Sequence, residues 1–100
     1  MGASNFSDSA YAVTAKDAYA ETVDRAHYNH GHDPYNGTIS TTEGFKIYPL
    51  LQGETLEEWH NRAWDNPLVM KRGDCACVAD PDKPIVNGIT LWHFAGWAAE

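Results

Sequence analysis

The sequence predicts one α+β domain, with two helices packed on one face of a mainly antiparallel sheet of about four strands. Three observations lead to this fold class. Two segments carry apolar residues at helical spacing, β-branched and apolar runs between and after them are typical of strands, and 100 residues suit a single domain. The expected element order is α-β-β-α-β-β. Helices gathered on one face of an antiparallel sheet are a common arrangement for such an order.

The first helix is expected from Ala15 to His30, where apolar side chains recur at three- and four-residue intervals. Thr14 is the expected N-cap, and Gly31 is a natural residue to end the helix. Residues 1–13 are polar and contain several turn-forming side chains. We therefore expect them to be a weakly ordered lead-in to a domain that covers residues 14–100.

A turn followed by a hairpin is expected after the first helix. Pro34 prevents the helix from continuing, and the Asn-Gly pair that ends the segment 33–37 supplies positive φ angles. Residues 38–42 are rich in β-branched side chains and are expected to form a strand. Residues 45–48 are the expected return strand of the hairpin.

The second helix is expected from Leu56 to Asp65, because Thr55 and Glu58 have the spacing of a capping box. Two further strands are expected, over residues 75–79 and 89–97. The last of these is apolar at both alternating sets of positions, which is typical of a central or well-covered strand.

Composition and charge exclude some classes of partner. The chain has 14 acidic and 7 basic residues and a formal net charge of -7. Direct binding to nucleic acid is not expected, because it requires clusters of Lys and Arg. No apolar run reaches membrane-spanning length, and the first residues do not have the pattern of a signal peptide. We therefore expect no membrane partner and a cytoplasmic location.

Histidines near the end of the first helix are the sharpest candidates for a metal site. His27 and His30 lie within one helical turn, and His32 and Asp33 follow closely, so that the four side chains could hold zinc. Their spacing matches no standard zinc motif. The alternative is that these histidines interact with the carbonyl groups at the helix C-terminus. We expect no cofactor, with zinc as the alternative.

The junction between the first helix and the first strand is a candidate ligand site. Hydroxyl groups and backbone amides beside a glycine are able to hold a phosphate or nucleotide. The candidate residues are His30, Tyr35, Gly37, Thr38 and Ser40. The alternative is a strand with a solvated hydroxyl face.

The two cysteines are expected to be free thiols. Cys75 and Cys77 are separated by one residue, which gives poor disulfide geometry in a strand. Either thiol combined with His60 or His93 and an acid such as Asp74 would provide a nucleophilic site. The alternative, that both thiols are packed in the core, favours a protein without catalysis.

Acidic side chains line one face of each expected helix and are candidates for binding a basic partner. The alternative is that they form ordinary solvated helix faces. The candidate residues for a partner surface are Asp17, Glu21, Asp24, Tyr28, Glu57 and Glu58.

Three segments of the chain are similar to a group of small uncharacterised bacteriophage proteins. They are residues 35–39 with the pattern YxGTI, residues 72–77, and the C-terminal aromatic-rich segment 92–98. The resemblance covers residues 15 to 99. It implies a phage or prophage accessory protein, and it brings no catalytic residues with it.

The expected function is therefore binding to a host protein in the infected cell, as in host modulation or inhibition of a host defence. One alternative is a small-ligand or nucleotide-binding domain, or a small enzyme, with its site at the junction after the first helix. Another is a minor virion or assembly protein. Self-association through an edge of the sheet is also an expected possibility for a small sheet domain.

Overall fold

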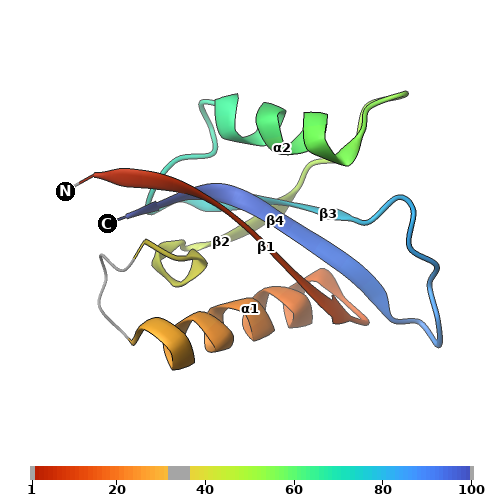
Figure 1. Cartoon of the computed structure of the whole chain (residues 1–100), viewed down its shortest axis with the longest axis horizontal. Coiled ribbons are helices and arrows are strands. Elements are labelled where there is room, and N and C mark those ends of the chain that lie inside the picture. The colour runs from red at the N-terminus through yellow and green to blue at the C-terminus, as the bar shows by residue number, and fades with distance from the viewer. Residues whose placement is uncertain (1, 32–36, 100) are drawn as a thin grey trace.

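The computed structural model describes residues 2–31 and 37–99. It is an α+β fold with two helices and a four-stranded sheet in the order β1-β4-β3-β2 (Figure 1). The strands are β1 (Ala3–Ala12), β2 (Gly44–Ile47), β3 (Asp74–Ala79) and β4 (Thr90–Ala99). β4 pairs antiparallel with β1 and with β3, whereas β2 pairs parallel with β3. The sheet is therefore mixed, although mostly antiparallel.

Both helices begin directly after the predicted capping residues, Thr14 and Thr55, and the predicted bounds of both helices are confirmed. α1 spans Ala15–His30, and the Thr14 hydroxyl accepts a 3.1 Å hydrogen bond from the Asp17 amide. α2 spans Leu56–Asp65 and begins with a complete capping box between Thr55 and Glu58. These contacts satisfy amides that have no partner within the helix.

The prediction that both helices pack on one face of the sheet is wrong, because α1 and α2 cover opposite faces (Figure 1). β3 explains this arrangement: Cys75 and Cys77 join the core beneath α1, while Ala76 and Val78 join the core beneath α2. Successive side chains of a strand point to opposite faces. A strand that is apolar at every position needs cover on both sides.

Residues 3–12, which we expected to be part of a weakly ordered lead-in, form the ten-residue edge strand β1. Every one of them pairs with β4, from Ala3 opposite Ala99 to Ala12 opposite Thr90. Phe6 and Ala10 pack into the core on the α1 side. The intervening Ser7 and Ser9 point to the other face, toward α2. The strand pairing therefore outweighs the turn preference of this polar segment.

The predicted strand over residues 38–42 is wrong, because Ile39–Thr41 is a 3-10 helix, η1. The hydroxyls of Thr41 and Thr42 donate to the carbonyls of Thr38 and Ile39, at 2.9 and 2.7 Å. Such side-chain hydrogen bonds offer the backbone an alternative to strand pairing. The predicted hairpin is absent as well, since β2 pairs with β3 in parallel.

The indole groups of the Trp residues form hydrogen bonds that link different parts of the fold. Each of the four Trp side chains donates its Nε1–H to a backbone carbonyl, at 2.7 to 3.2 Å. The Trp64 indole, from α2, reaches the Phe6 carbonyl of β1 at 3.1 Å. Arg25, from α1, reaches the Ser9 carbonyl at 3.2 Å. The edge strand β1 is thereby fastened to both helices.

Candidate functional site

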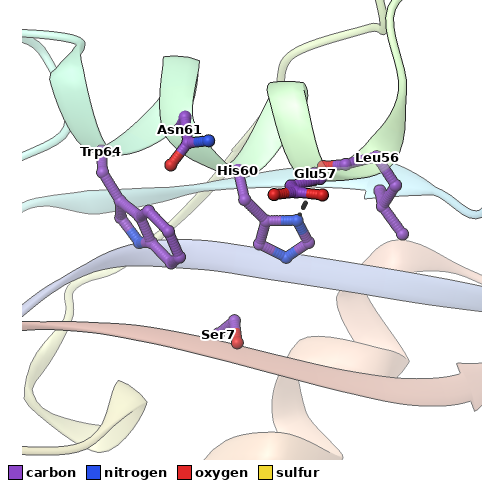
Figure 2. A pocket seen from close by; sticks show the side chains of 6 residues that line it. All are labelled: Ser7, Leu56, Glu57, His60, Asn61 and Trp64. Carbon is purple, nitrogen blue, oxygen red and sulfur yellow. Dashed lines mark hydrogen bonds between the residues drawn. The ribbon is translucent and has the colours of Figure 1, made fainter.

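An open groove runs between α2 and β1, on the face of the sheet opposite α1 (Figure 2). Its larger part encloses about 440 Å³ and is lined by Ser7, Leu56, Glu57, His60, Asn61 and Trp64. An adjoining part of about 290 Å³ is lined by Ser7, Asp8, Ser9, His60 and His93. The two parts share Ser7 and His60, and we call them together the α2–β1 groove.

The groove exists because α2 covers only part of its face of the sheet. Trp59 and Ala63 pack α2 onto β3 and β4. The small side chains Ser7 and Ser9 of β1 then leave a hollow beside the helix. Helical spacing turns Leu56 and the residues four and eight positions later toward this hollow. One wall of the groove is therefore polar strand, and the other is helix.

His60 lies at the centre of the groove in a fixed orientation. Its Nδ1 lies 2.8 Å from the Leu56 carbonyl, which can only accept, so that Nδ1 carries the hydrogen. When the ring is neutral, Nε2 is then an acceptor. Figure 2 shows the His60 ring extending from α2 toward the sheet, with Ser7 on the strand opposite. The ring also contacts Trp59 and Trp64, at centroid distances of 5.1 and 5.6 Å.

His93 and Asp80 form a paired unit at the far end of the groove. The His93 Nε2 lies 2.6 Å from an Asp80 carboxylate oxygen, and their side chains are only 14% and 9% exposed. The other Asp80 oxygen accepts from the amides of Asp82 and Lys83. Burial raises the pKa of Asp80, but these hydrogen bonds outweigh it and hold that pKa below its usual 3.8. The rings of His93 and His60 lie 6.0 Å apart.

The groove carries negative charge without a matching positive side chain. Glu57 lies on its helical wall, and no Lys or Arg is among the described residues that line either part. Arg62, the one basic residue of α2 besides His60, binds Glu54 at 2.8 Å and the Pro49 carbonyl at 2.9 Å. It is therefore already paired outside the groove.

The predicted ligand site is only partly assembled. His30 and Thr38 come together in a hollow of about 110 Å³, lined also by Asp8, Thr22, Arg25, Ala26 and Asn29. The Ser40 hydroxyl lies 2.8 Å from the Thr38 hydroxyl, and the Gly37 amide donates to the Ala99 carbonyl. Tyr35 lies outside the described residues. Small-molecule sites generally enclose about 300–1,000 Å³, so this hollow is small for a nucleotide.

The hollow beside His30 also holds a half-buried acid. Burial raises the pKa of the Asp8 carboxyl above its usual 3.8, and the nearby Arg25 guanidinium opposes that shift. The Arg25 guanidinium thus acts on Asp8 through its charge, while the direct contact between α1 and β1 is the hydrogen bond from Arg25 to the Ser9 carbonyl.

The predicted metal site cannot be assembled from the described part of the chain alone. His27 and His30 lie in the last turn of α1, while His32 and Asp33 lie outside the described residues. Across residues 2–31 and 37–99, no group of three or more His, Cys, Asp or Glu side chains is placed to hold a metal ion.

The sheet separates the predicted nucleophiles from the predicted bases. Cys75 and Cys77 are buried free thiols on the α1 side. His60 and His93 lie on the α2 side, in the groove. Burial raises the pKa of both thiols, that of Cys77 to about 12. The proposed combination of cysteine with either histidine is therefore wrong, and the cysteines are core residues.

The predicted partner-binding residues lie on opposite sides of the molecule. Four are exposed along α1, where Tyr28 is 91% exposed. The other two belong to α2, where Glu58 is engaged in the capping box and Glu57 lines the groove. The six candidate residues therefore do not form one continuous surface. The α1 residues are Asp17, Glu21, Asp24 and Tyr28.

The sequence patterns around the groove residues indicate only which way the side chains point, and neither pattern predicts a site. Ser7 and Ser9 lie at alternate positions between the core residues Phe6 and Ala10 of β1, so that both point to the same face of the sheet. His60 and Trp64 lie four residues apart on one helix face. The pairing of Asp80 with His93 had no local signal, because it depends on how β3 and β4 are aligned.

Comparison with protein-family models, curated proteins and solved structures found no match for this chain. None of the helices within the described residues is both long and apolar enough to cross a membrane. The fold and the groove thus define a small acidic α+β domain with an open, polar and aromatic groove on the α2 side of its sheet.

Proposed function

We propose that this chain is a small accessory protein of phage type that binds a host protein at the α2–β1 groove and catalyses no reaction. The groove is the observation that carries the proposal. It combines an aromatic wall at His60 and Trp64 with hydroxyl and amide groups at Ser7 and Asn61. Concave surfaces with aromatic anchors and a polar rim suit the side chains of another protein.

The chemistry of the groove favours binding over catalysis. Within residues 2–31 and 37–99, neither the Ser7 nor the Ser9 hydroxyl is hydrogen-bonded to a histidine. A serine nucleophile needs such a base within reach. The thiols lie on the other side of the sheet, with their pKa raised by burial. The phage context itself comes from the resemblance of the sequence motifs.

Two matched substitutions test the proposed function. Asn61→Arg places a long cation in the groove, and Asn29→Arg makes the same change on α1, beside His30 and Thr38. The wild-type chain is used to capture proteins from host lysate, and any captured protein is purified and titrated against all three chains. We expect at least tenfold weaker binding for Asn61→Arg and unchanged binding for Asn29→Arg. The reverse pattern would indicate that the partner binds at α1. Failure to capture any host protein reproducibly would refute the proposal.

Small-ligand binding is a second candidate function, supported by the size of the groove. Its larger part, of about 440 Å³, falls within the usual range for small-molecule sites. Thermal-shift measurements against nucleotides and divalent metals test this candidate. A specific ligand present far above its dissociation constant should stabilise the fold by a few kcal/mol. Asn29→Arg and Asn61→Arg then distinguish the hollow beside His30 from the α2–β1 groove.

A further inference from the structure

We propose that the partner segment held in the α2–β1 groove is basic, with arginine side chains that enter the groove beside Trp64 and Glu57. This inference rests on the proposed function and names the chemistry of the partner. Charge complementarity is its first support, since the chain has a formal net charge of -7. The groove contributes to this imbalance directly.

The carboxylates of the groove are arranged to attract a cation. Glu57 is exposed on the helical wall, and within residues 2–31 and 37–99 it has no Lys or Arg within ion-pair distance. Asp8 adds a second carboxyl group to the lining of the adjoining part, while Asp80 lies behind His93 with both oxygens already hydrogen-bonded. No Lys or Arg is among the described residues that line the groove, so a positive side chain entering it would meet hydrogen-bond acceptors such as Ser7 and Asn61. Attraction of this kind sets partner preference and speeds association.

The aromatic wall favours arginine in particular. A guanidinium group is planar, stacks on aromatic rings and donates several hydrogen bonds at once. The Trp64 ring offers a face for such stacking, and its indole is fixed by the hydrogen bond to the Phe6 carbonyl. The Ser7 hydroxyl and the Asn61 amide oxygen are acceptors on either side. The groove is therefore already arranged before the partner arrives, which lowers the cost of binding.

The acidic face of α1 is a weaker site for the same partner. Its acids are accompanied by basic side chains, and Glu21 lies 4.0 Å from Arg25. Asp17 follows Lys16 in the first turn, and both are exposed. Exposed, interspersed charges of this kind contribute little to binding. The hollow that lies beside α1, next to His30, encloses only about 110 Å³.

A pair of synthetic peptides tests the basic-segment inference. One alternates arginine and serine, and its counterpart has citrulline, a neutral analogue of arginine, at every arginine position. Each peptide is titrated into the isotopically labelled chain, and the indole N–H signals of the four Trp residues are followed by NMR. We expect the arginine peptide to shift the Trp64 indole and amides of α2 and β1. The citrulline peptide should bind at least tenfold more weakly.

Two charge-removing variants provide the matched control. Glu57→Gln should raise the Kd of the arginine peptide by about two- to fivefold, as expected for the loss of one exposed charge pair. Glu21→Gln removes the same charge from α1 and should leave the Kd unchanged. Equal binding of the two peptides, an equal effect of the two variants, or no groove shift at millimolar peptide would overturn the inference.

The outcome is separable from that of the proposed function. Suppose that Asn61→Arg abolishes binding of a captured host protein while Glu57→Gln leaves its Kd unchanged. Binding at the groove would then stand, but the partner segment would not be basic. Specific binding of the arginine peptide without capture of any host protein would support the cation preference of the groove and refute the proposed function.

Discussion

At the scale of single residues, the pair formed by Asp80 and His93 fixes one end of the groove. Asp80 receives three hydrogen bonds, from His93 and from two backbone amides. Both side chains are nearly buried, so that removal of one partner leaves the other without its hydrogen bond. The same pair connects the loop after β3 to the middle of β4, which holds the floor of the groove in place.

We predict that Asp80→Asn destabilises the fold by about 1–3 kcal/mol at neutral pH, as expected for a hydrogen bond to a charged group. The pKa of Asp80 is lowered in the folded state, so its carboxylate stabilises the fold above its unfolded-state pKa, near 3.8. That contribution is lost as the pH falls through the lowered folded-state pKa. Urea unfolding of both chains at several pH values measures this. A difference in stability that persists unchanged at the lowest pH would contradict the assignment.

At the scale of elements, β1 has the largest structural consequence. It pairs with β4 over ten residues and supplies one wall of the groove. Its Phe6 and Ala10 side chains also fill the core beneath α1. An element with these contacts belongs to the cooperative unit of the fold, in contrast to the weakly ordered lead-in that we predicted from its composition.

We predict that a chain beginning at residue 13 loses cooperative urea unfolding, because β4 would lose its ten-residue partner and the α1 core its covering side chains. Circular dichroism during urea titration measures this. A synthetic peptide of residues 2–13, added in excess, should restore the transition. A truncated chain that unfolds cooperatively at the wild-type urea midpoint would show that β1 is dispensable.

Elements whose structure depends on residues close together in the sequence could be predicted, and elements that depend on distant pairing could not. α1 and α2 were predicted correctly because Thr14, Thr55 and Glu58 act within one turn of their own position. The segment 38–42 was predicted incorrectly because its hydroxyls bond the nearby backbone, and this competes with strand pairing. The groove could not be predicted, since it requires residues 3–12 to pair with residues 90–99 across the whole chain.

At the scale of the whole molecule, the sheet separates two candidate binding surfaces, one on each of its faces. The α1 side carries the acidic helix face with Tyr28 and the small hollow beside His30 and Thr38. The α2 side carries the groove with His60 and Trp64. The sheet lies between α1 and α2 (Figure 1). A partner with one flat binding surface can therefore contact only one of the two helices.

The central claim, that the partner binds at the α2–β1 groove, is tested most directly by photo-crosslinking from the two faces. A photoreactive amino acid replaces Asp65, one turn after Asn61 on α2, in one chain and Asp24, on α1, in another; both positions are exposed. We predict that, in host lysate, the chain labelled at position 65 crosslinks one host protein reproducibly and the chain labelled at position 24 does not. Crosslinking from position 24 alone, or equal crosslinking from both positions, would contradict the account.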